Sequence, residues 1–335
     1  MNDSHIKIKS LTRWLRFGMA IFGSLLLAVA CHHGASIPIN DQITNAACRQ
    51  IEHAAGVTCI PEKVQRLVTL DDASFQNAIA LGIQPVGSVI SDYSSYLHNK
   101  FVHVKNIGNN SEPNLESILA LNPDLILGFD YRQYIYDIAS QIAPTVLLTF
   151  EHSGQWKEVF NNISVALGKR ETAQQVMENY YRRLEEFKQQ IGNDLSKIKV
   201  SVVRVYPTNI NLYLLDSFCG TVLQDAGLSR PESQNFTAPQ AKKLFGNPIQ
   251  MSIGNELIEK ADGDVIFIWT AENSTQENQT AKKKLDQLNS NPLWQNLKAV
   301  QNNKVYLVPD YWIGDGVLAA NAIIDDLFKY LIKQP

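Results

Sequence analysis

The cysteines are the residues whose spacing most directly suggests chemistry. Cys48 and Cys59 bracket the segment CRQIEHAAGVTC, which predicts two short strands around residues 54–56. A disulfide between them would close a hairpin, and two free thiols are the alternative. His53 lies between them, but a Cys-x10-Cys spacing does not match a zinc site. We predict a Cys48–Cys59 disulfide in an oxidising compartment, no metal, and a buried packing role for Cys219.

The N-terminus has the pattern of a secretory signal. A basic head at 1–16 precedes an uncharged apolar run at 17–30, which is too short to span a bilayer comfortably. The run ends in LAVAC, which resembles a bacterial lipobox. On that interpretation Cys31 begins the mature chain and carries lipid that holds it at a membrane surface. Cleavage to a periplasmic protein without lipid is the main alternative, and a short membrane anchor or a buried helix is another.

Composition and motifs argue against several functions. The formal net charge is −3 with acids and bases interspersed, so nucleic acid is not expected as a partner. No GxGxxG follows a predicted strand, and P-loop, HExxH and GxSxG motifs are absent from the sequence. Because no catalytic constellation is visible, we predict that the protein is not an enzyme and has no cofactor.

Two series of alternating strands and helices are predicted around one helical stretch. The first series has strands at 66–70, 85–90, 124–129 and 145–150, and the second has strands at 199–206, 264–270 and 304–309, with a possible edge strand at 211–215. Between them, 156–191 is helical, with Gly168 separating two helices. This pattern predicts an α/β fold of two Rossmann-like lobes with parallel sheets, joined by one long helix. The expected parts are a signal at 1–30, a tether and hairpin at 31–60, an N-terminal lobe at 61–160, connecting helices at 161–195 and a C-terminal lobe at 196–335.

Several segments, in order, resemble the bacterial solute-binding proteins of the iron-siderophore and vitamin B12 uptake class. The similar segments are RLVTLDDASFQNAIALGIQPVGSVI, EPNLESILALNPDLILGF, DSFCGTVLQDAGLSRP, NELIEKADGDVIFIW and GDGVLAANAIIDDL. They extend over nearly all of 45–333. The opening CRQIEHAAGVTCIP is similar to ferric-siderophore members of cyanobacterial type. The resemblance implies a two-lobed, chelatase-like clamp with limited hinge closure and a ligand at the carboxyl ends of the parallel strands.

The resemblance also implies partners. Members of this class dock on an ABC permease through one surface glutamate on each lobe. Glu116 in NLESIL and Glu256 in NELIEKADGD fit these two positions. The alternative is that both glutamates are ordinary acidic residues on exposed helix surfaces. Charge pairs at such a rim orient docking more than they add affinity.

A cleft for a compact, anionic ferric siderophore requires guanidinium donors and aromatic walls. Side chains of these two types occur just beyond several of the predicted strands. Arg132 and Arg204 are the stronger candidates, because a charge at a strand end needs a partner. The full set of expected ligand-binding residues is Tyr93, Tyr131, Arg132, Trp156, Arg204, Tyr206, Trp269 and Trp312. Aromatic residues at strand ends also serve as core plugs, so both roles remain open for them.

We therefore predict a monomeric lipoprotein of the periplasm or cell surface that captures a ferric siderophore and delivers it to a permease. A hydroxamate or citrate-hydroxamate ligand is favoured. Haem or cobalamin in the same fold remains an alternative, as does an exported enzyme or a surface sensor or adhesin that binds no small molecule.

Overall fold

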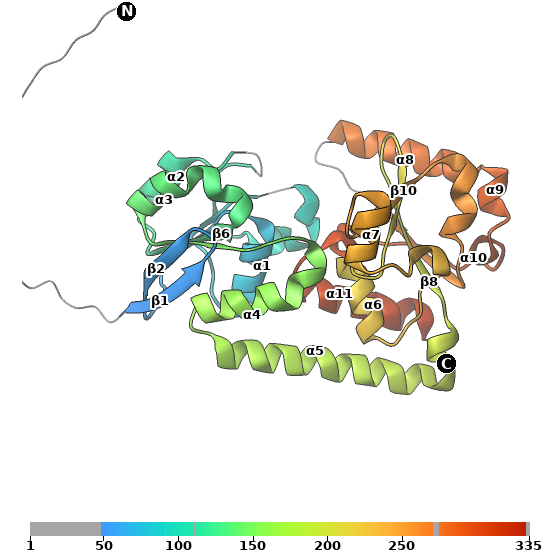
Figure 1. Ribbon diagram of the computed structural model, residues 1–335, viewed down its shortest axis with the longest axis horizontal. Coiled ribbons are helices and arrows are strands. Elements are labelled where there is room, and N and C mark those ends of the chain that lie inside the picture. Colours follow the sequence, from blue (N-terminus) through green and yellow to red (C-terminus); the bar gives the residue numbers. More distant parts are fainter. Residues whose placement is uncertain (1–47, 91, 110–111, 271–274, 333–335) are drawn as a thin grey trace, which may run out of the picture. The chain divides into compact units, whose positions relative to one another are not determined.

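The computed structural model describes residues 48–90, 92–109, 112–270 and 275–332 (Figure 1). Residues 45–335 form one compact unit, within which we distinguish two lobes by their sheets. No helix in the described ranges combines the length and the apolar character needed to cross a bilayer.

A disulfide-closed hairpin opens the described chain. Strand β1 (Cys48–His53) pairs antiparallel with β2 (Gly56–Pro61). Cys48 and Cys59 are bonded, with their Cα atoms 5.6 Å apart, which confirms the predicted pairing. The hairpin is fixed to the first lobe where the Ala54 amide donates to the Leu147 carbonyl over 2.9 Å.

The N-lobe sheet is entirely parallel, with strand order β5-β4-β3-β6-β7. Alternate residues along its central strands enter two different cores. Leu125 and Leu127 pack with helices α1 and α4, whereas Ile126 packs with α2 and α3. The strands and helices are β3 (Leu67–Thr69), α1 (Asp72–Ala80), β4 (Gly87–Ser88), β5 (Lys105–Asn106), α2 (Leu115–Ala120), β6 (Leu125–Phe129), α3 (Tyr136–Ile142), β7 (Thr145–Leu148) and α4 (Trp156–Ala166).

The C-lobe sheet has the order β10-β9-β8-β11-β12 and is mixed, not wholly parallel as predicted. Strand β9 runs antiparallel to both β8 and β10, so 210–213 is an interior strand and not an edge. The cause is the short connection from β8 to β9, where the Tyr206 amide donates to the Asn209 carbonyl over 2.9 Å. A connection this short can only return the chain antiparallel, because a parallel neighbour needs a long crossover.

The remaining elements pack on the two faces of this C-lobe sheet. Helices α6 and α11 share one core with β8 and β11, and α7 to α10 contribute to the other. Cys219 is a buried free thiol in α6, as predicted. The elements are β8 (Val200–Val205), β9 (Ile210–Tyr213), α6 (Phe218–Asp225), α7 (Ala238–Phe245), β10 (Gln250–Ile253), β11 (Val265–Trp269), α8 (Thr275–Asn289), α9 (Pro292–Gln295), α10 (Lys298–Gln301), β12 (Val305–Leu307) and α11 (Val317–Leu331).

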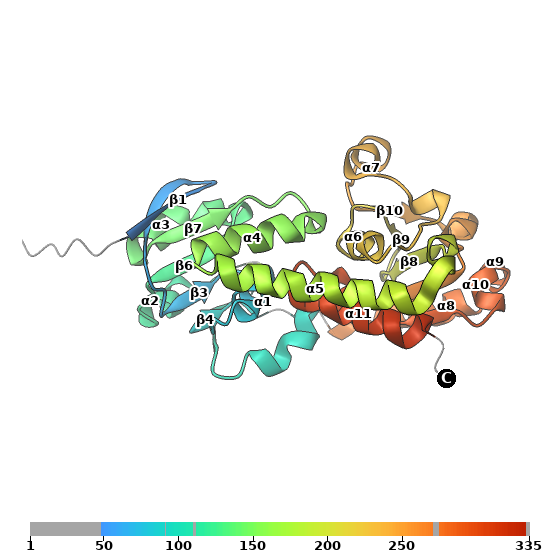
Figure 2. The same cartoon turned by 90° about the horizontal axis from the view of Figure 1, so that it is seen from below.

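One long helix, α5 (Arg170–Ile191), follows α4 and lies beside α11 (Figures 1 and 2). Gly168 separates α4 from α5 with φ +65°, a left-handed conformation that favours glycine. Tyr180, Leu184 and Phe187 bury the apolar stripe of α5 in a core that also contains residues of α1, α4, α6 and α11. The Tyr180 hydroxyl donates to Asp225 Oδ2 over 2.8 Å. A single core therefore joins both lobes through the connecting helices.

Candidate functional site

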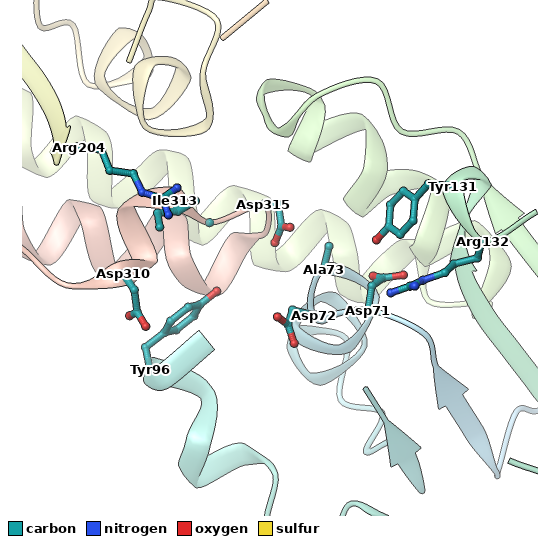
Figure 3. A pocket seen from close by; sticks show the side chains of 11 residues that line it. Asp71, Asp72, Ala73, Tyr96, Tyr131, Arg132, Arg204, Asp310, Ile313 and Asp315 are labelled. Carbon is teal, nitrogen blue, oxygen red and sulfur yellow. The ribbon is translucent and has the colours of Figure 1, made fainter. Parts of the chain in front are cut away.

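The candidate site is a pocket of about 460 Å³ formed by residues of both lobes (Figure 3). The N-lobe contributes the start of α1 and the residues that follow β6. The C-lobe contributes the end of β8 and the turn that leads into α11. The lining residues are Asp71, Asp72, Ala73, Tyr96, Tyr131, Arg132, Arg204, Asp310, Ile313, Gly314 and Asp315.

Asp71 is placed by the connection between β3 and α1. It is the N-cap of α1, and its Oδ1 accepts a hydrogen bond of 2.7 Å from the Ser74 amide. Its side chain is only 3% exposed, and burial raises the pKa of Asp71 to about 7. The hydrogen bond from Ser74 and the charge of Arg132 oppose this rise in the pKa.

Asp315 joins the pocket to the contact between the lobes. It follows the 3-10 helix η7 (Asp310–Ile313), and its Oδ1 accepts a hydrogen bond of 2.6 Å from the Gln76 side-chain amide of α1. The next residue, Gly316, lies so close to α1 that an added Cβ would be 2.6 Å from Gln76 Cδ. Burial, and then the charges of Asp72 and Asp71, raise the pKa of Asp315 to about 8.

Tyr131 and Arg132 are positioned by the 3-10 helix η2 (Asp130–Ile135), directly after β6. Tyr131 is 49% exposed and packs against Phe129 and Phe150. Arg132 is buried, with its guanidinium carbon 5.1 Å from the centre of the Tyr131 ring. The guanidinium points toward the Asp71 carboxyl group (Figure 3). Tyr131 and Arg132 therefore place an accessible aromatic ring beside a buried cation.

Arg204 lies near the end of β8, on the opposite side of the pocket from Arg132 (Figure 3). Its side chain is 5% exposed, and its Nη1 donates to the Tyr213 hydroxyl over 3.3 Å. The Tyr206 ring packs against the guanidinium, with 4.1 Å between the guanidinium carbon and the ring centre. Tyr206 does not line the pocket and instead supports the arginine that does.

The three tryptophans of the predicted set lie in the core and do not line the pocket. All of them are fully buried. Trp156 Nε1 donates to Thr221 Oγ1 over 3.0 Å, and Trp312 Nε1 donates to Asp326 Oδ2 over 2.8 Å. Trp269 packs on Tyr213, with ring centres 5.0 Å apart. These rings fill the space between sheet and helices. Their buried positions do not support the predicted ligand contact.

The remaining predicted residues fall into two groups. Glu116 and Glu256 are exposed, in the first turns of α2 and of the 3-10 helix η6 (Asn255–Ala261). Cys31 lies outside the described residues. Tyr93 belongs to the 3-10 helix η1 (Asp92–Lys100), but its side chain is outside the described part of the structure.

The acidic residues of the pocket were not among the ligand-binding residues predicted from the sequence. Asp71 and Asp72 directly follow the first predicted strand, and Asp310 and Asp315 follow the last one. Their position after strand ends was the available indication. Among the described residues, no group of three or more His, Cys, Asp or Glu side chains is arranged to hold a metal ion. The lining has charged side chains and a partly aromatic wall, and it is suited to non-covalent binding of a charged ligand.

Comparisons with known proteins agree with this architecture. A family model described as periplasmic binding protein matches residues 67–311. A probable siderophore-binding lipoprotein of Bacillus subtilis is 33% identical over 92% of this chain and 95% of its own length. The achromobactin-binding periplasmic protein of Dickeya dadantii is 30% identical over 79% and 86%, respectively. The crystal structure of Staphylococcus aureus SirA complexed with staphyloferrin B has a TM-score of 0.73 and 29% identity, and the match covers 84% of this chain and 98% of that one.

Proposed function

The chain belongs to the periplasmic binding protein family, and from this membership we propose that it is the substrate-binding component of an ABC importer that captures a ferric siderophore. The observation that carries the proposal is the pocket at the strand ends of both lobes, with Arg132 on one side and Arg204 on the other. Relatives named for siderophore binding match the chain over most of its length.

Within the pocket, Arg204 is the proposed partner of anionic ligand oxygens, and Arg132, which faces Asp71, is proposed to border the ligand at the other end. Both guanidiniums are buried at the pocket wall, where a charge-assisted hydrogen bond is stronger than in water. Tyr131 supplies an exposed aromatic surface beside Arg132. A hydroxamate or citrate-hydroxamate complex is the favoured ligand type.

Delivery requires a second interaction, with the permease. Glu116 and Glu256 each present an exposed carboxylate on a different lobe, and we assign them to docking on permease arginines. The lipid proposed at Cys31 would keep the protein near that partner, at the periplasmic or outer face of a bacterial membrane, and the binding unit is proposed to be a monomer.

The proposal is tested by titrating the purified protein, with tryptophan fluorescence as the readout. Trp269 is the strand partner of Arg204 between β11 and β8, so it reports on the pocket wall. The panel contains ferric hydroxamates, ferric citrate-hydroxamates, ferric citrate, ferric catecholates, haem and cobalamin. Saturable submicromolar quenching by a ferric complex, and not by its iron-free form, is expected. Binding of haem or cobalamin alone would overturn the proposed ligand, and silence across the panel would overturn the proposed function.

A further inference from the structure

The middle of the pocket is lined by carboxyl groups from both lobes. Asp71 and Asp72 come from the start of α1, and Asp310 and Asp315 come from η7 and the turn after it. In Figure 3, Asp71, Asp72 and Asp315 lie between the two arginines, and Arg204 and Arg132 occupy opposite ends. The two cations are therefore separated by a group of acids.

The charges of the lining do not suit a ligand that is anionic throughout. Four aspartates and two arginines line the pocket, so acidic side chains outnumber basic ones there. Arg132 also faces Asp71, and its charge lowers the pKa of that carboxyl group. A negatively charged ligand group placed among these acids would be repelled, because the charges would lie close together in a pocket less polar than water. Arg204 lies at the end of the pocket opposite Arg132 and is the second cation of the lining (Figure 3).

Asp71 provides a second, independent indication of what the ligand presents. Its Oδ1 is engaged by the Ser74 amide, but its Oδ2, in a side chain only 3% exposed, has no hydrogen-bond partner within the described ranges. An acceptor buried without a donor costs stability. Because Asp71 lines the pocket, the ligand is one source of the missing donor.

We infer that the ligand is a ferric complex whose periphery carries an ammonium group or comparable N–H donors in addition to its anionic iron-binding oxygens. The donor end lies against Asp71, Asp72 and Asp315, and the anionic oxygens lie toward Arg204. This assignment rests on the proposed function and specifies the chemical class of its ligand.

Proton exchange on binding gives a readout that needs no variant. Burial raises the pKa of Asp71 to about 7 and that of Asp315 to about 8, so both are partly protonated near neutral pH. The titratable and polar groups that face them are Asp72, Arg132, Tyr96, Tyr131 and the Gln76 amide. A cation beside these carboxyls favours their ionised form, so its binding releases protons. A purely anionic ligand would favour the neutral form and take protons up.

The test compares three ferric complexes by calorimetric titration of the whole mature protein. Ferrioxamine B ends in a primary ammonium, its N-acetylated derivative lacks that charge, and ferric citrate is anionic. We expect ferrioxamine B to bind roughly tenfold more tightly than the acetylated complex, because hydrogen bonds to charged groups are the stronger ones. We also expect it to release protons at pH 7.5, measured in two buffers of different ionisation enthalpy.

Variants assign that preference to the pocket. Asp315→Asn keeps an oxygen that can accept from Gln76, and it should shrink the ratio between the two ferrioxamines to below about threefold. Asp286→Asn, an exposed position on α8, should leave the ratio unchanged.

Other results would count against the inference. Equal binding of the two ferrioxamines, or proton uptake, overturns it. If ferric citrate or another ferric complex binds and neither ferrioxamine does, the inference is also overturned. The proposed function then still stands. Failure of every ferric complex to bind overturns the proposed function itself.

Discussion

The side-chain amide of Gln76 donates a 2.6 Å hydrogen bond to Asp315, and this bond links α1 of the N-lobe to the turn before α11 of the C-lobe. The same turn supplies part of the pocket lining. The contact that joins the lobes and the candidate ligand site are therefore adjacent, and a change in one is expected to alter the other.

Gly316→Ala tests this adjacency. Gly316 has an extended backbone, so the substitution introduces no backbone strain, but the new Cβ would lie 2.7 Å from Asn77 Oδ1. Overpacking of this kind costs about 1–3 kcal/mol. We expect a lower free energy of unfolding in urea and weaker ligand binding, because Asp315 must shift with its neighbour. Wild-type stability would show that the two elements separate without cost.

Arg204→Ala should weaken binding of the ferric complex by about tenfold or more, since a buried charge-assisted hydrogen bond is lost. Arg204→Lys keeps the charge but loses the planar fork, so it should restore only part of the affinity. Fluorescence titration measures both. Arg182→Ala, on the exposed side of α5, is the matched control. If Arg204→Ala binds as tightly as this control, Arg204 does not contact the ligand.

Removing both proposed docking carboxylates, Glu116→Ala with Glu256→Ala, should abolish uptake and leave ligand affinity intact. Both side chains are exposed and neither lines the pocket. The loss of uptake would therefore reflect weaker docking on the permease and not weaker ligand binding. Uptake of radiolabelled iron in a deletion strain and titration of the purified variant give the two readouts. Glu178→Ala with Glu185→Ala on α5 is the control pair. Normal uptake by the variant that lacks both Glu116 and Glu256 would show that these carboxylates do not mediate docking on the permease.

The empty protein should lose stability as the pH rises from 6.5 to 8.5. Asp71 has a folded-state pKa of about 7 and Asp315 of about 8, both above the ordinary value of 3.8. The folded state therefore holds protons in this window that the unfolded chain has already released, so the free energy of unfolding falls as the pH rises. Asp315 accounts for about 2 kcal/mol over this range and Asp71 for about 1 kcal/mol.

Urea unfolding at the two pH values measures this effect. Asp315→Asn should remove the larger part of the dependence and Asp71→Asn a smaller part, while Asp286→Asn should retain it. His53 has a lowered pKa and works in the opposite direction, but mainly near and below pH 6.5, so it offsets only a small part of the expected fall. A stability that rises between pH 6.5 and 8.5 would contradict the assignment.

Much of the fold could be predicted because strand and helix periods are strong in this chain. The buried runs at β3, β6, β8 and β11 and the apolar stripe of α5 were identified from their spacing. The direction of β9 was not predicted, because a four-residue strand shows the same alternation of residues whether it runs parallel or antiparallel to its neighbour. Only the length of the connection distinguishes the two directions. Strand β10 is short and partly exposed, so its pattern is weak.

The site was predicted only in part, for a related reason. Tyr131, Arg132 and Arg204 do line the pocket, since residues at strand ends gather at one edge of a sheet. Trp312 follows a strand in the same way but turns inward to donate to Asp326. Asp71 has the sequence pattern of a helix cap, and it is one, so nothing in its local pattern distinguished a capping carboxyl group from one that also lines a cavity.

The core that runs through α5 into both lobes has a consequence for transport. If that shared core holds Glu116 and Glu256 at one fixed spacing, the permease meets the same pair of carboxylates whether or not a ligand is present. Empty protein would then compete with loaded protein for the transporter. We expect excess empty protein to inhibit uptake in reconstituted vesicles, and the rate of import to depend on the fraction of binding protein that is loaded as well as on its amount.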